Sequence, residues 1–323
     1  FKGDCMIRYI LKRILQAVPL LLVISFIVFT LIHLAPYDAI DAQITSNMSQ
    51  EEINILREQS GLNKPFLIQY VDWLGQILSG NFGHSLVTHN SVGEEILAKI
   101  PNTISLVLPA YITALIIAIV LGLLAAANKG KWQDKFIDAV ASLGIATPSF
   151  WIAMIFIYVL GYQLNLFPII GMHTIGKEDD FGDFLSHFIM PYLTLTIVFF
   201  AELTRYVRSS ALSQTNEEYV VVQQAFQATK TQIFTRHIIK NVLIPVITQV
   251  GMSLPMLVTG AIITETVFSW PGIGPYITQA TRALDYPIIM AVMLLSATLV
   301  IVGNLISDRL YSIVDPRIRR GGK

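Results

Sequence analysis

Few side chains in this sequence are placed to perform chemistry. The phosphate-binding pattern G-x-x-x-x-G-K-[ST] does not occur, because Gly130-Lys131 and Gly176-Lys177 lack the rest of the motif. The six histidines are scattered without metal-binding spacing, and the single cysteine, Cys5, excludes an internal disulfide framework. No Ser/His/Asp arrangement is visible, although such triads are recognised in space rather than in sequence. We therefore expect a chain that is not an enzyme, binds no metal or cofactor, and cannot hydrolyse ATP itself.

The apolar run between residues 241 and 264 contains a stripe of small and polar residues. Its members recur every three or four residues, so they lie on one face of a helix. Such a polar, small and flexible face suits a permissive conduit across a membrane, and helix packing explains it nearly as well. We take its members as candidates for a translocation pathway: Gln249, Ser253, Met256 and Gly260.

Glu265 ends this apolar run and is a further pathway candidate. It precedes the rigid turn Trp270-Pro271-Gly272-Ile273-Gly274, whose tryptophan would anchor at a membrane interface. Three roles are open for the carboxylate: capping local backbone, pairing with Arg282, or lining the outer mouth of a pathway. Ionisable residues are otherwise nearly missing from the apolar runs, which disfavours a proton- or sodium-coupled carrier.

The composition indicates an all-α membrane protein. Of 323 residues, 54% are hydrophobic and only 14% are charged, and a soluble chain could not bury that much apolar surface. A helix needs about 20 apolar residues to cross the hydrocarbon core of a bilayer. Glu202 and Arg205 interrupt one of the runs, which is the weakest. Six transmembrane helices are expected, at 14–34, 102–127, 139–163, 188–206, 241–264 and 286–307.

Most lysines and arginines fall on one side of these spans when the amino terminus is placed in the cytoplasm. Because basic residues near membrane-spanning helices are retained inside, this asymmetry predicts cytoplasmic termini, a basic inner face and an acidic outer face. Cys5 precedes Met6, which looks like a natural start, so residues 1–5 are expected to be an extension. The predicted organisation is a cytoplasmic N-terminus 1–13, a first span 14–34, an extracytoplasmic helical segment 35–100, a core membrane domain 101–311 with an inner segment 207–240, and a cytoplasmic tail 312–323.

The outer segment 35–100 carries its own helix signals. Ser49 and Glu52 form a capping box, and Pro65 can open a second helix that ends before Gly80. The apolar stripe of this second helix either packs on the bundle, rests on the membrane surface, or docks a partner.

The inner segment 207–240 combines charges and amides with more apolar side chains than a solvated linker would carry. We expect it to fold into short helices that bury this surface. A cytoplasmic partner subunit is the natural candidate for covering it, and packing on its own bundle is the alternative.

Several spaced motifs resemble those of a known family. The chain is similar, over residues 6–318, to the inner-membrane permeases of oligopeptide, dipeptide and nickel ATP-binding-cassette (ABC) importers, particularly the first of the two permeases in each system. The motifs that carry the resemblance are Asn81-Phe82-Gly83-His84-Ser85, Thr147-Pro148-Ser149-Phe150-Trp151, Leu203-Thr204-Arg205-Tyr206-Val207-Arg208, Glu265-Thr266-Val267-Phe268, Trp270-Pro271-Gly272-Ile273-Gly274, Asp285-Tyr286-Pro287 and Asp315-Pro316-Arg317-Ile318.

The resemblance implies the type I permease architecture of ABC importers, in a bacterial inner membrane. It implies half of a translocation pathway for peptides, or alternatively for nickel or a metal chelate. A second, similar permease would complete the pathway, two cytoplasmic ATPases would bind ATP and Mg²⁺, and an extracytoplasmic binding protein would deliver substrate. No nucleic acid is expected as a partner. A membrane-embedded enzyme or a sensor is the alternative from a different class.

In this family a short coupling helix docks on the ATPase, and here it maps to residues 218–228. The family usually has glycine where this chain has Gln227, so we expect a different turn, because a positive φ costs a non-glycine residue about 1 kcal/mol. Basic residues of the family are replaced by Val221, Gln224 and Phe226. His237, Asn241 and Pro245 are spaced by four, so they would share one face of a helix. This face would pass movement of the ATPases to the fifth span. The predicted coupling residues are Glu218, Tyr219, Val220, Ala225, Gln227, Arg236, His237 and Asn241.

Overall fold

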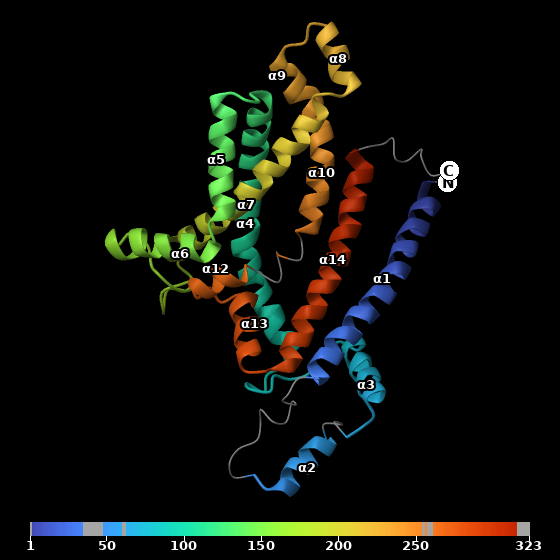
Figure 1. The fold of residues 1–323 in the computed structure, drawn as a ribbon. Coiled ribbons are helices and arrows are strands. Elements are labelled where there is room, and N and C mark those ends of the chain that lie inside the picture. Colours follow the sequence, from blue (N-terminus) through green and yellow to red (C-terminus); the bar gives the residue numbers. More distant parts are fainter. Residues whose placement is uncertain (1, 35–47, 60–62, 254–255, 257–260, 315–323) are drawn as a thin grey trace.

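The computed structural model describes residues 2–34, 48–59, 63–253, 256 and 261–314. Within these residues the regular structure is helical, apart from one isolated bridge between His84 and Ser91, so the all-α prediction is confirmed. The long helices are α1 (Lys2–His33), α4 (Val92–Ala127), α5 (Trp132–Ala146), α7 (Phe181–Gln214), α10 (Ile239–Met252) and α14 (Tyr286–Val314) (Figure 1).

Four helices of the described chain are long and apolar enough to cross a membrane by themselves. They include the predicted first, second, fourth and sixth spans. The predicted fourth span is the central part of a much longer helix, because α7 continues on both sides of the expected limits. The four segments are Leu15–His33, Val92–Ala127, Phe181–Gln214 and Tyr286–Ser307.

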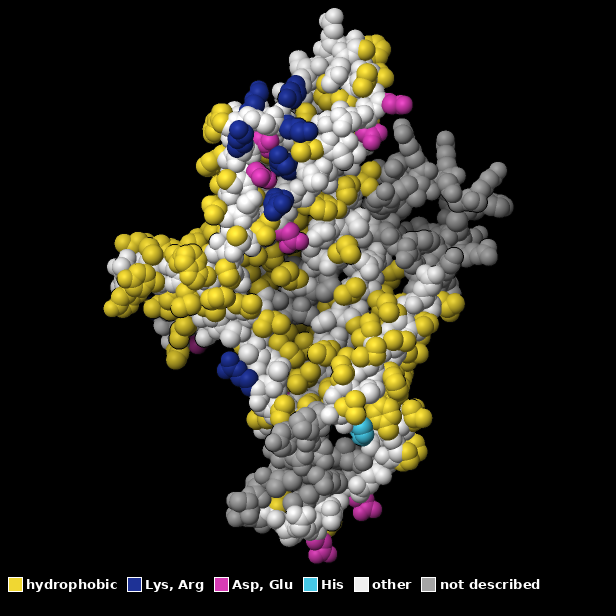
Figure 2. All heavy atoms as spheres, viewed as in Figure 1, with side chains coloured by type: hydrophobic (Ala, Val, Ile, Leu, Met, Phe, Trp, Pro, Cys, Tyr) yellow, Lys and Arg dark blue, Asp and Glu magenta, His cyan; other side chains and the backbone are white. Residues whose placement is uncertain are grey.

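The predicted third span is wrong as a single straight helix. The chain breaks at Thr147-Pro148 and bends by 96° between α5 and the segment formed by α6 (Ser149–Phe156) and the π-helical η2 (Ile157–Gln163). Proline disfavours helical backbone in the preceding residue, and Thr147 is accordingly extended, with φ −93° and ψ 120°. The α6–η2 arm projects sideways from the bundle with exposed apolar side chains that suit lipid or another subunit (Figures 1 and 2).

The predicted fifth span starts correctly, with α10, but residues 254–255 and 257–260 lie outside the described part of the chain. The next described helix is the short α12 (Ile262–Val267). Counting the bent pair as one span gives up to five spans in the described residues. Six spans and cytoplasmic termini therefore stay predictions. In Figure 1, α1 begins and α14 ends towards the end of the bundle where α4 turns into α5.

The centre of the bundle is the contact between α4 and α7. Small residues recur every four positions along α4 and are buried there: Ala110, Ala114, Ala118, Gly122 and Ala126. Small side chains permit close helix approach, and a Cβ at Gly122 would lie only 2.7 Å from Cγ1 of Val207 on α7.

The outer segment packs on α1. Helix α2 (Gln50–Gln59) begins with the predicted capping box, in which Glu52 Oε2 accepts from the Ser49 backbone N–H at 2.7 Å. Helix α3 (Phe66–Leu78) places Tyr70 against α1, where its hydroxyl lies 2.8 Å from Ser25 Oγ. Of the three alternatives for the apolar stripe of α3, packing on the bundle is therefore the one observed.

Candidate functional site

The inner segment folds into a helical hairpin beyond the ends of α4 and α5 (Figure 1). Its first arm, α8 (Glu218–Ala225), lies within the predicted coupling helix. Its second arm begins with α9 (Lys230–Gln232), where Thr229 and Gln232 form a capping box, and continues through the π-helical η3 (Ile233–Ile238) into α10. The hairpin is thus continuous with the fifth predicted span.

The turn at the tip of the hairpin is built around Gln227, and its expected difference from the turn of the family stays a prediction. Gln227 adopts the left-handed backbone usually occupied by glycine, with φ 57°. Its N–H donates to the Gln224 carbonyl at 2.9 Å, and the Ala228 N–H donates to the Gln223 carbonyl at 3.0 Å, which together form a Schellman motif. The two carbonyls that would lack partners at the helix end are thereby satisfied. Their hydrogen bonds hold Gln227 in its unfavourable conformation.

Helix α8 has one face turned to its own chain. Val220 is 2% exposed and packs with Ile233, Phe234 and Ile238 of η3. Tyr219 is half-buried, its hydroxyl donates to Gln214 Oε1 at 3.1 Å, and burial raises the pKa of the phenol. Two of the predicted coupling residues therefore hold the helix to its own chain.

The opposite face of α8 is exposed and apolar. It consists of Val221, Val222, Ala225 and Phe226, and the ring of Phe226 is 79% exposed. Ala225 is on this face, and the exposed Glu218 is on the same side at the start of the helix. Val221, Val222 and Phe226 are not among the predicted coupling residues, because apolar residues occupy both faces of the helix and remove the amphipathic signal. We call these four residues the outer face of α8.

The predicted face of His237, Asn241 and Pro245 runs from η3 into α10 and stays a prediction. Asn241 and Pro245 line a cavity of about 440 Å³ together with the end of α7, whereas His237 is not among its lining residues. His237 is half-buried and Arg236 is exposed, both in the π-helical η3.

Three of the pathway candidates on the fifth predicted span are described, together with Glu265, and Gly260 lies outside the described residues. Ser253 donates to the Gln249 carbonyl at 2.9 Å, and its hydroxyl lies 3.0 Å from that of Tyr111 on α4. Met256 is 38% exposed. The polar stripe therefore turns partly towards α4 and partly towards the surface.

Glu265 lies inside this fold, and its assignment as a pathway residue stays a prediction. It is fully buried, and its Oε2 accepts from the Gly274 N–H at 2.7 Å, at the start of α13 (Ile273–Arg282). Of its three possible roles, capping local backbone is the one observed. A Cβ at Gly272 would overlap the carboxylate. Burial raises the pKa of Glu265, just beyond the fifth predicted span, to about 7.

The outer turn around Glu265 is fastened to the start of the apolar part of α4. Trp270 donates its indole N–H to the Asn102 carbonyl at 2.8 Å, and the Ile273 N–H donates to Thr103 Oγ1 at 2.9 Å. Trp270 is completely buried instead of lying at an interface. We call this assembly of residues 102–103 and 265–274 the outer knot.

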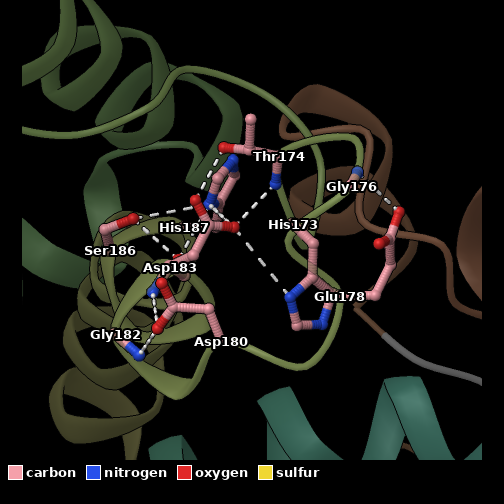
Figure 3. Close-up of polar contacts among 9 residues, drawn as sticks. All are labelled: His173, Thr174, Gly176, Glu178, Asp180, Gly182, Asp183, Ser186 and His187. Atoms are coloured by element: carbon pink, nitrogen blue, oxygen red, sulfur yellow. Dashed lines mark hydrogen bonds and ion pairs between the residues drawn. The ribbon is translucent and has the colours of Figure 1, made fainter.

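A second outer loop is held at the start of α7 (Figure 3). Thr174 donates to Asp183 through its N–H and its hydroxyl, both at 2.6 Å, and Asp180 caps the helix by accepting from the Gly182 N–H at 2.8 Å. His187 Nδ1 lies 3.5 Å from Asp183 Oδ2. Among the described residues no group of three or more His, Cys, Asp or Glu side chains is placed to hold a metal ion. These contacts position a loop.

Comparisons with known proteins agree along the whole chain. Residues 118–320 match the family described as binding-protein-dependent transport system inner membrane component, and residues 6–107 match the N-terminal part of such membrane components. The oligopeptide transport system permease protein AppB of Bacillus subtilis is 38% identical over 97% of this chain and 99% of its own length. The dipeptide permease protein DppB of Alkalihalophilus pseudofirmus is 33% identical over 97% and 100%.

A metal-staphylopine import permease of Staphylococcus aureus, CntB, is 34% identical over 98% of this chain and 100% of its own length. The inward-facing methionine ABC transporter MetNI has a similar fold, with a TM-score of 0.53 at 16% identity over 68% of this chain and 96% of that one. Because the family match covers most of the chain, this protein belongs to the inner-membrane components of binding-protein-dependent transport systems.

Proposed function

We propose that this chain is one of two permease subunits of an ATP-driven importer for peptides. The observation that carries the proposal is the outer face of α8, an exposed apolar surface at the end of a helical hairpin in a chain without a phosphate-binding loop. A permease that cannot hydrolyse ATP needs a contact with an ATPase subunit that drives its conformational change. Peptides are the proposed cargo because two of the relatives named above are oligopeptide and dipeptide permeases.

The orientation of the chain in the membrane follows from the distribution of its lysine and arginine residues. Figure 2 shows lysine and arginine side chains gathered around one end of the bundle, where α4 turns into α5 and α7 leads into the hairpin. This basic end faces the cytoplasm under the positive-inside rule. The opposite end, with the outer knot and α2 and α3, then faces the binding protein that delivers the peptide.

The outer face of α8 suits a protein partner better than lipid. Lys129 and Lys131 mark the end of the bundle, and the hairpin extends beyond them (Figure 1). An exposed apolar face in water is covered when a short helix docks in a groove of another protein. We assign that groove to a cytoplasmic ATPase, with Val220 and Tyr219 holding the helix to the permease.

The pathway itself needs the second permease. Met256 of the polar stripe is exposed, and we expect a facing subunit to cover it. We therefore expect a complex of two permeases, two ATPases and a binding protein.

Reconstitution tests this function. The chain would be co-expressed with its companion subunits, purified and placed in liposomes, and uptake of labelled di- and oligopeptides would be followed with ATP inside. Peptide uptake that requires ATP, both permeases and the binding protein is the expected result. ATP-driven uptake of nickel or a metal chelate without peptide uptake would overturn the proposed cargo. Activity of the chain alone would overturn the proposed assembly.

A further inference from the structure

Asp134 and Arg208 form a two-point ion pair at the basic end of the bundle. Arg208 Nε donates to Asp134 Oδ1 at 2.6 Å, and Nη2 donates to Oδ2 at 3.0 Å. The Gly130 N–H also donates to Oδ2, at 2.8 Å. The Asp134 side chain is 5% exposed and that of Arg208 is 26% exposed. Paired, charge-assisted hydrogen bonds fix both the distance and the orientation of the two groups.

The pair joins elements that are distant in sequence. Asp134 lies in the first turn of α5, directly after the turn from α4, and Gly130 belongs to that turn. Arg208 lies on α7, within about two turns of the end from which the chain enters α8. At the same level, a Cβ on Gly122 of α4 would lie 3.1 Å from the backbone nitrogen of Arg208. The inner ends of α4, α5 and α7 are therefore tied to one another.

The same region receives the buried side of α8. Val220 packs in a core that contains Ala126 of α4, Val207 and Ala211 of α7, and Phe234 of η3. Val207 directly precedes Arg208. Because a packed core transmits displacement instead of absorbing it, any shift of α8 acts on this group of helices as well as on η3 and α10.

We propose that Asp134 and Arg208 are a positioning pair for energy coupling. They keep the inner ends of α4, α5 and α7 together as one body when α8 is displaced. This inference rests on the proposed function, in which an ATPase moves α8. The pair adds a second route by which displacement of α8 reaches the membrane helices. The route expected from the sequence led only through His237, Asn241 and Pro245 into the fifth span. Loss of the pair leaves ATP hydrolysis intact and lets the inner ends of these helices move independently.

Two near-isosteric variants of the reconstituted complex test the pair. Asp134→Asn removes the charge and keeps an acceptor, and Arg208→Lys keeps the charge but cannot form the two-point contact. The measured quantity is the number of peptides transported per ATP hydrolysed. We expect this ratio to fall by roughly fivefold or more in both variants, while the ATPases still co-purify. Lys135→Gln, which removes an exposed charge next to Asp134 on α5, is the matched control and should leave the ratio unchanged.

The outcomes separate the two proposals. An unchanged ratio in both pair variants would overturn the positioning role, and so would loss of the ATPases from both, because the pair would then serve assembly alone. A fall of the same size in Lys135→Gln would also overturn it. Failure of the unmodified complex to import peptide would instead count against the proposed function.

Discussion

The hydroxyl of Tyr219 donates to Oε1 of Gln214 at 3.1 Å, and this contact ties the first turn of α8 to the last residue of α7. The predicted coupling helix is thus held by its own subunit at a residue that the family resemblance assigns to coupling. Tyr219 then acts by fixing the direction in which the outer face of α8 points.

Tyr219→Phe and Tyr219→Asp should therefore differ. The phenylalanine variant loses one hydrogen bond, worth about 1 kcal/mol, and should retain most peptide transport. The aspartate variant puts a charge into a half-buried apolar site and should uncouple ATP hydrolysis from transport. Both activities would be measured in the reconstituted complex. Equal loss of transport in the two variants would contradict this role.

The outer face of α8 should decide whether the ATPase binds. Val221→Glu or Phe226→Glu would place a charge in an apolar interface, and we expect the affinity of the ATPase for the permease to fall by roughly tenfold or more. Gln224→Glu introduces the same charge on the same helix outside that face and is the control. Binding would be followed by titrating purified ATPase onto permeases in nanodiscs. Undiminished binding by both variants would show that another surface docks the ATPase.

Helix type could be predicted from sequence, whereas several local departures could not. The runs of α1, α4 and α14 are long enough for composition alone to decide. The bend at Pro148 was missed because the apolar run continues across it without interruption. The pair of Asp134 and Arg208 could not be predicted, because its members are 74 residues apart and the packing of α5 on α7 brings them together.

The Schellman turn of α8 should gain stability from glycine. Gln227 holds a left-handed backbone that glycine adopts without the Cβ clash, so Gln227→Gly should stabilise the turn by about 1 kcal/mol. Gln224→Gly, inside the last turn of α8, should destabilise the helix by about the same amount. Hydrogen exchange of the 220–230 amides would measure both changes. Slower exchange in Gln227→Gly and faster exchange in Gln224→Gly are expected, and changes of the same sign would contradict the conformation of Gln227.

The outer knot should lose stability as the pH rises through neutrality. Burial raises the pKa of Glu265 from 4.5 to about 7 in the folded state. The stabilising contribution of its protonated form is therefore complete below the unfolded value of 4.5 and is lost as the pH passes 7. The shift corresponds to at most about 3 kcal/mol.

Glu265→Gln isolates this effect, because the amide oxygen can still accept from the Gly274 N–H and carries no charge. Thermal unfolding of the purified complex would be recorded from acidic to alkaline pH for both forms. We expect the glutamine variant to melt at a higher temperature than the unmodified protein above pH 7 and to lose this advantage in acid. A difference between the two melting temperatures that stays constant with pH would show that the buried carboxyl group does not titrate in this range.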